Sequence, residues 1–124
     1  MNRVNIVQSY VEHLSNGALE NVLSLFAKDA IVRSPLYGNK NYKDFYTELF
    51  ADTNNSEISV KGIFEDPRSG NLALHFIYQW TLSNEKQVHF EVVDIIEFTS
   101  DDKISTLTII YDTVLSRELL KELK

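Results

Sequence analysis

The stretch FEVVDIIEF, residues 90–98, decides the fold of the second half of this chain. Branched aliphatic and aromatic residues in such a run favour an extended strand, whose side chains point alternately to opposite faces. The more apolar face carries Phe90, Val92, Asp94, Ile96 and Phe98. An unpaired carboxylate among apolar side chains costs several kcal/mol. Asp94 is therefore predicted to be paired, to be neutral, or to face a cavity.

Three other stretches of the second half alternate in the same way. They are EISVKGIFED (57–66), NLALHFIYQWTLS (71–83) and KISTLTIIYDT (103–113). The connecting segments DPRSGN, NEK and SDDK are rich in turn-forming residues and are typical of hairpins. The sequence thus predicts a meander of strands over about residues 57–112.

The first half of the chain has the helical period instead. Apolar residues recur every three or four positions on both sides of the break SNG at 15–17. They are Val4, Val7, Val11 and Leu14 before the break, and Leu19, Val22, Leu23 and Phe26 after it. We expect helices within about residues 3–28, a helix over about 41–51 and a helical tail over about 115–124. The segment AIVRSPLYGN (30–39) is expected to be extended.

Helices followed by a strand meander predict a single α+β domain, residues 1–124. The helices are expected to pack on one face of a strongly curved, mixed or antiparallel sheet. The other face also carries apolar residues, which are Ile77, Val93, Ile95 and Ile110. A monomer would expose them, so we expect a homodimer through this outer face. The helical tail would either cover that face or cap the end of the sheet.

Composition and charge argue against several classes of partner. The 124 residues carry a net charge of −6 without a basic stripe, so nucleic acid is not an expected partner. No apolar run approaches the roughly 18 residues that span a bilayer, and the N-terminus is too polar for a secretory signal. The chain has no cysteine. A cytoplasmic protein without membrane contact is expected.

A metal site is not expected either. The absence of cysteine removes thiolate ligands, and His13, His75 and His89 are not spaced i, i+4 on one helix. None of the chemistry considered below requires a cofactor, so none is predicted.

The segment VQSYVEHLSNGALENVLSLFAKDAIV (7–32), with its LFAKDA core, resembles the opening of the nuclear-transport-factor-2-like superfamily. The order of elements and the late strand ending in IYD (110–112) are similar too. Within the superfamily the chain is most similar to ketosteroid isomerases and the SnoaL-like group. The resemblance extends to about Thr113 and implies a cone-shaped sheet, a cystatin-like roll, around an apolar pocket.

The resemblance assigns roles to four residues. Tyr10 falls where the isomerases have the tyrosine of their oxyanion hole, and Asp94 falls where they have a carboxylic acid kept neutral by an apolar site. Tyr46 resembles a tyrosine that hydrogen-bonds the oxyanion tyrosine from behind. Ser34, directly before Pro35, replaces the aspartate that acts as general base. A serine hydroxyl cannot shuttle a proton without another base. Ser34 is therefore a candidate catalytic residue together with Tyr10 and Asp94 only if a base such as a nearby water assists it, and otherwise it lines the cavity or begins the turn at Pro35.

The strand register adds a candidate wall for a ligand. These residues are Phe26, Tyr78, Trp80, Phe90, Val92, Leu107, Ile109 and Tyr111. Packing in an ordinary core is the alternative for each of them. Three functions stay open: a cofactor-independent isomerase, cyclase or lyase acting on an apolar, oxygen-bearing ligand; a non-catalytic protein that binds such a ligand; and a dimeric interaction module whose cavity has no use.

Overall fold

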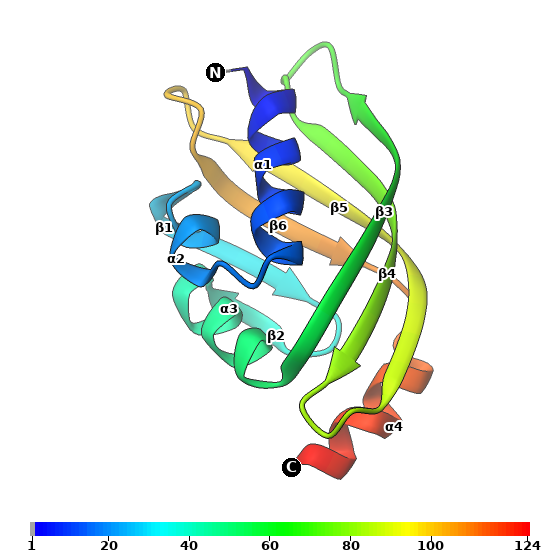
Figure 1. Cartoon of the computed structure of the whole chain (residues 1–124). Coiled ribbons are helices and arrows are strands. Elements are labelled where there is room, and N and C mark those ends of the chain that lie inside the picture. The colour runs from blue at the N-terminus through cyan, green and yellow to red at the C-terminus, as the bar shows by residue number, and fades with distance from the viewer. Residues whose placement is uncertain (1) are drawn as a thin grey trace.

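Six strands form one sheet in the computed structural model, which describes residues 2–124 (Figure 1). The strand order is β2-β1-β6-β5-β4-β3, and every adjacent pair is antiparallel except β1 with β6. The strands are β1 (Phe26–Ser34), β2 (Gly38–Asn41), β3 (Thr53–Glu65), β4 (Leu72–Leu82), β5 (Gln87–Phe98) and β6 (Ile104–Ile110). The predicted α+β class with a mixed sheet is confirmed.

The sheet curves strongly around helix α1 (Arg3–Ser15), which lies in its concave face (Figure 1). Bulges in β3 interrupt its pairing with β4 between Thr53 and Asn55 and between Val60 and Gly62. Such bulges increase the local twist of a strand. Buried positions alternate along β4, and they place Leu72, Leu74, Phe76, Tyr78 and Trp80 on a largely apolar concave face. The result is a cone with its core between the sheet and the N-terminal helices.

Helix α1 begins and ends where its sequence dictates. The side chain of Asn2 caps the first turn by accepting a hydrogen bond from the backbone N–H of Asn5. Gly17 follows the helix with a φ of +68°, a conformation that costs glycine little, so the chain can turn sharply. The buried face of α1 is formed by Ile6, Val7, Tyr10 and Leu14. This face points into the cone.

The expected helix within residues 3–28 is too long at its C-terminal end. Helix α2 covers only Leu19–Leu23, and Phe26 already begins β1. The backbone N–H of Ile104 donates to the carbonyl of Leu25, and Phe26 pairs with Ile104 in parallel. Pairing with β6 therefore replaces the helix. The spacing of apolar residues could not reveal this change. Phe26 is buried, and its burial fits both a helix continuing from Val22 and a strand in which it points inward.

The remaining helices lie at the open end of the cone. Helix α3 (Tyr42–Ala51) packs beside β1 and β2, and α4 (Val114–Leu123) lies near the ends of β4 and β5 (Figure 1). Lys86, before β5, pairs with Glu122 of α4. The sequence predicts that the helical tail either covers the outer sheet face or caps the end of the sheet. Helix α4 lies at the end of the cone and leaves the outer sheet face uncovered. None of the helices in residues 2–124 has the length and apolarity to cross a membrane.

Candidate functional site in the cone interior

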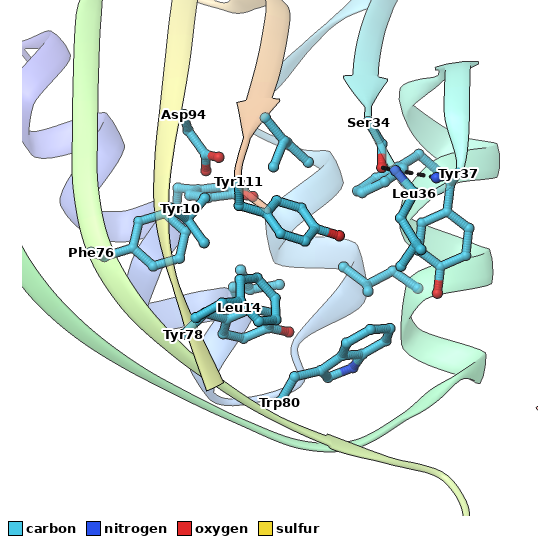
Figure 2. A pocket seen from close by; sticks show the side chains of 15 residues that line it. Tyr10, Leu14, Ser34, Leu36, Tyr37, Phe76, Tyr78, Trp80, Asp94 and Tyr111 are labelled. Atoms are coloured by element: carbon cyan, nitrogen blue, oxygen red, sulfur yellow. Dashed lines mark hydrogen bonds between the residues drawn. The ribbon is translucent and has the colours of Figure 1, made fainter. Parts of the chain in front are cut away.

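A cavity of about 50 Å³ lies inside the cone, between α1, the concave sheet face and the turn after β1 (Figure 2). Most of its wall is apolar or aromatic. The lining residues are Tyr10, Leu14, Ser34, Leu36, Tyr37, Phe45, Leu49, Phe76, Tyr78, Trp80, Phe90, Val92, Asp94, Ile109 and Tyr111. Asp94 is the one member of this set with an acidic side chain, and the set contains no lysine, arginine or histidine.

Asp94 is buried in the middle of β5 with 2% of its surface exposed. Its register partners on the neighbouring strands are Leu74 and Ile109, neither of which offers a polar side chain. Its Oδ1 atom has no hydrogen-bond partner among residues 2–124. Loss of water raises the pKa of the Asp94 carboxyl to about 8. The group is therefore mostly protonated at pH 7, and its carboxyl points into the cavity (Figure 2).

Tyr10 reaches the same part of the cavity from α1. Its hydroxyl lies 2.7 Å from the hydroxyl of Tyr46 in α3, and both groups are buried. Desolvation raises the pKa of both phenols well above the ordinary value, and the nearby Asp94 raises them further. Both tyrosines are therefore neutral. Tyr46 supports Tyr10 from behind and does not itself line the cavity.

Ser34 both lines the cavity and begins the turn after β1. Its Oγ atom accepts hydrogen bonds from the backbone N–H groups of Leu36 at 3.1 Å and Tyr37 at 3.0 Å (Figure 2). These two bonds occupy the two lone pairs of the hydroxyl, while its proton stays available for donation. Ser34 is thus a possible donor to a ligand but is poorly suited to accept a proton from one.

The other polar groups of the wall are mostly committed to protein partners. Tyr78 shares a 2.7 Å hydrogen bond with Ser56, and Trp80 Nε1 donates to Thr53 Oγ1 at 2.7 Å. The hydroxyl of Tyr37 donates to Asp52 Oδ2 at 2.7 Å. These contacts fix the shape of the wall but leave few polar groups that can form hydrogen bonds with a ligand.

Tyr111, just after β6, is different. Its hydroxyl makes no hydrogen bond within the described chain, and it points across the cavity towards the side of Leu36 (Figure 2). Burial raises its pKa to about 12, and the Arg117 guanidinium opposes that shift. Its ring stacks on Phe90 with 4.4 Å between the centroids. The groups free to contact a ligand are therefore Asp94, Tyr10, Ser34 and Tyr111.

Most of the residues that the sequence singles out meet in this cavity. Those that line it are Tyr10, Ser34, Tyr78, Trp80, Phe90, Val92, Asp94, Ile109 and Tyr111. Phe26 lies behind Tyr10, stacked on Tyr42 at 5.3 Å, and Leu107 is wholly buried in the core. Their alternation along the strands is the same as that of the lining residues, so the pattern alone does not separate core from wall.

The sequence reading missed six lining residues. They are Leu14, Leu36, Tyr37, Phe45, Leu49 and Phe76. Leu14 shares a helical face with Tyr10, and Phe76 shares a strand face with Tyr78, so periodicity contains a signal for these two. Leu36 and Tyr37 lie in a turn, where no period fixes the direction of a side chain.

Histidines contribute nothing to the cavity. His75 pairs with Glu91 on the outer face of the sheet. Within residues 2–124, no group of three or more histidine, aspartate or glutamate side chains is arranged to hold a metal ion.

Comparisons with known proteins place this geometry in context. Residues 7–107 match the model of the SnoaL-like domain family. No curated protein matches the chain in sequence. Many solved structures share its fold, and the three described next are under 25% identical to it.

One of them is a nuclear-transport-factor-2-like protein of unknown function from Burkholderia pseudomallei, with a TM-score of 0.82 and 17% identity over 96% of this chain and 97% of that one. AclR, a putative hydroxylase from Streptomyces galilaeus, has a TM-score of 0.77 and 14% identity over 98% and 97%. SalBIII, an epoxide hydrolase/cyclase-like enzyme of pyran ring formation in salinomycin, has a TM-score of 0.78 and 14% identity over 89% and 90%. At these identities the likeness concerns the fold alone.

Proposed function

The chain belongs to the SnoaL-like domain family, and from the chemistry of its cavity we propose that it binds a ligand whose buried end is a compact, neutral carbonyl group. The observation that carries this proposal is Asp94, a buried carboxyl without a protein partner for Oδ1 and with a pKa of about 8. A buried polar group without a partner is costly, so such a group is expected to have a use. A carbonyl oxygen is the acceptor that a neutral carboxyl would bind.

Tyr10 and Asp94 would donate to the same oxygen. The Tyr46 hydroxyl can donate a hydrogen bond to the Tyr10 oxygen, and the Tyr10 O–H is then free to donate a hydrogen bond to the ligand. Two donors in a water-poor cavity stabilise a carbonyl oxygen most strongly when it gains negative charge, as it does in an enolate. The arrangement therefore supports chemistry at a carbon next to a carbonyl, of the isomerase, cyclase or lyase type, without a cofactor.

The size of the cavity limits the ligand. Its volume of about 50 Å³ is smaller than the roughly 150 Å³ of an engineered cavity that encloses benzene. A four-ring steroid would not fit in the enclosed part. A small ring or a short chain would fit only if part of it extends out of the cavity. A ligand with a compact head group is therefore proposed in place of a steroid.

A second candidate is binding without turnover. Ser34 stands where the isomerases have their base, and both of its lone pairs are taken by backbone N–H groups. No lining residue other than Asp94 is a carboxylate or a histidine. Asp94 is mostly protonated at pH 7 and is therefore poorly placed to act as the base there. This observation favours a hydrophobic-ligand-binding protein, unless the substrate or a water molecule accepts the proton.

Phenols test the proposal because a phenolate oxygen mimics an enolate. We expect 4-methylphenol to bind with a dissociation constant measurable by calorimetry, and we expect Asp94→Asn and Tyr10→Phe each to weaken it by about tenfold. Tyr42→Phe is the matched control, since Tyr42 is buried outside the cavity. Absence of binding to the unmodified protein, or equal binding by all four proteins, would contradict the proposed site.

Incubation of 2-methylcyclohexanone in D₂O separates the two candidates. Deuterium uptake at the carbons next to the carbonyl, followed by NMR, indicates an enzyme. Binding without uptake above the uncatalysed rate indicates a binding protein.

We also propose that the protein is a cytoplasmic homodimer. The outer sheet face supports the dimer, because Ile110 is 54% exposed there and Phe64 is 60% exposed. Exposed apolar residues on an uncovered face indicate an interaction surface. The lack of cysteine is compatible with a reducing compartment.

A further inference from the structure

A separate depression of about 200 Å³ lies against α4, beside the cavity. It is lined by Leu36, Arg117, Leu120, Lys121 and Lys124. Leu36 also lines the cavity, so one side chain separates the two spaces. Three of the five residues are cationic in a chain with a net charge of −6.

The three cations share one face of α4. Arg117, Lys121 and Lys124 follow one another at intervals of four and three residues, which places them in a row along the helix. The row flanks the buried side of the helix, where Ser116, Leu119 and Leu123 face the protein. The helix therefore presents its positive row at the rim of the cone.

Arg117 is the cation of this row that is available to a ligand. Lys124 pairs with Glu48 and Asp52, and Lys121 lies 3.7 Å from Glu118. Arg117 has no carboxylate partner within residues 2–124. Its guanidinium instead donates to the carbonyl of Pro35 and, through Nε at 2.8 Å, to Thr113 Oγ1. These neutral contacts hold the charge in place without cancelling it.

The charge of Arg117 also influences a residue that lines the cavity. Its positive charge acts on the hydroxyl of Tyr111, which lines the cavity and makes no hydrogen bond in the described chain. The contact with Pro35 places the guanidinium beside Leu36, the residue common to both spaces. A ligand whose head reaches Asp94 and whose tail leaves past Leu36 would therefore end at Arg117.

We infer that this depression, termed here the α4 anchor (Leu36, Arg117, Leu120, Lys121 and Lys124), binds an anionic group, a carboxylate or a phosphate, at the far end of the ligand. A guanidinium is suited to this because its planar N–H fork matches both anions. The ligand class is then an amphiphile with a neutral carbonyl head, a short apolar linker and an anionic tail. The inference rests on the proposed carbonyl site for the head group.

The test uses matched pairs of phenols in which a carboxylate at the end of the tail is replaced by an uncharged methyl group. The acids are 4-hydroxyphenylacetate, 3-(4-hydroxyphenyl)propionate and 4-(4-hydroxyphenyl)butyrate, and the uncharged partners are 4-ethylphenol, 4-propylphenol and 4-butylphenol. Affinities are measured by calorimetry on the full chain at low and high salt. We expect at least one acid to bind about fivefold more tightly than its partner, and the gain to shrink in high salt.

Two variants assign the gain to Arg117. Arg117→Gln should abolish the advantage of the acid and leave the affinity of the alkylphenol unchanged, whereas Arg117→Lys should keep part of it. Lys28→Gln removes the same charge from an exposed position at the start of β1 and should keep all of it. Equal loss of both ligands in Arg117→Gln would mean that Arg117 acts only by holding α4, and would overturn the inference.

Failure of the anchor and failure of the carbonyl site give different results. Binding of alkylphenols with no gain for any acid overturns the anchor alone. Absence of binding by every phenol overturns the carbonyl site and the anchor together. A gain that survives in Arg117→Gln would also contradict the anchor, because its charge would then come from elsewhere.

Discussion

The hydroxyl oxygens of Tyr10 and Tyr46 lie 2.7 Å apart in the protein interior, and the Tyr46 hydroxyl has no other hydrogen-bond partner in the described residues. The pair connects α1 to α3 across the wall of the cavity. Because only Tyr10 lines the cavity, the role of Tyr46 is to orient the Tyr10 hydroxyl. Geometry therefore separates a residue that would touch a ligand from one that acts through it.

Removal of the Tyr46 hydroxyl should weaken the binding of a phenol without removing the binding site. Tyr46→Phe is expected to lower the affinity for 4-methylphenol by about fivefold, the effect of one hydrogen bond. Tyr10→Phe should lower it further, and the double variant should be no worse than Tyr10→Phe. Calorimetry on the four proteins gives the coupling between the two residues. Additive losses would show that Tyr46 does not act through Tyr10.

The pKa of Asp94 predicts an unusual dependence of stability on pH. The unfolded chain releases this proton near pH 3.8, whereas the folded chain holds it up to about pH 8. Between these values unfolding releases a proton, so the free energy of unfolding falls as the pH rises. The loss is about 1.4 kcal/mol per pH unit and roughly 6 kcal/mol in all. Below pH 4 this contribution no longer changes.

Asp94→Asn should remove that part of the pH dependence. Urea unfolding is measured at pH 4, 6 and 8. At each increase in pH, the free energy of unfolding of the variant is expected to rise relative to that of the original protein. Asp29→Asn, at an exposed position of β1, is the control for the loss of one charge. Parallel pH profiles for the original protein and Asp94→Asn would mean that Asp94 is ionised in the fold.

Ser34→Asp restores a carboxylate at the position of the missing base. The turn should survive, because an aspartate side chain can accept the backbone hydrogen bonds that Ser34 accepts from Leu36 and Tyr37. We expect the variant to convert 3-cyclohexen-1-one to its conjugated isomer, followed by ultraviolet absorbance. A steroid substrate should not react, given the cavity of about 50 Å³. Reaction with the steroid would show that the cavity opens far more than its closed volume suggests.

Arg3 is expected to stabilise the fold by connecting helix α1 to the hairpin turns near its N-terminus. Its guanidinium donates to Asp102 Oδ1 at 2.8 Å and to three carbonyls, and it lies 4.9 Å from the centroid of the Phe98 ring. It thereby joins α1 to both hairpin turns at that end. Arg3→Met should lower the free energy of unfolding by about 2 kcal/mol. Arg33→Met, at an exposed position of β1, should change it by less than about 0.5 kcal/mol.

The proposed dimer is tested by a charge on the outer sheet face. Ile110→Glu is expected to give a monomer in sedimentation velocity at micromolar concentration, because burying an unpaired carboxylate opposes association. Leu115→Glu changes an exposed residue of α4, outside the sheet, and should remain dimeric. A monomeric unmodified protein would refute the dimer.

Local periodicity was sufficient for much of this structure. The alternation in β5 determined that Asp94 faces inward with Val92 and Ile96, since a strand has only two faces. The helical stripe of α1 placed Tyr10 on the buried side for the same kind of reason. The sequence alone also indicated that a serine stands before Pro35.

Only the tertiary structure decided which inward residues meet. Three features depend on contacts between distant segments: the Tyr10–Tyr46 hydrogen bond, which joins positions 36 apart, the start of β1 at Phe26, and the position of α4 at the open end. A period records the face of a side chain but not its partner across the core. The neutral state of Asp94 likewise follows from the number of apolar neighbours that exclude water, and those neighbours come from several separate elements.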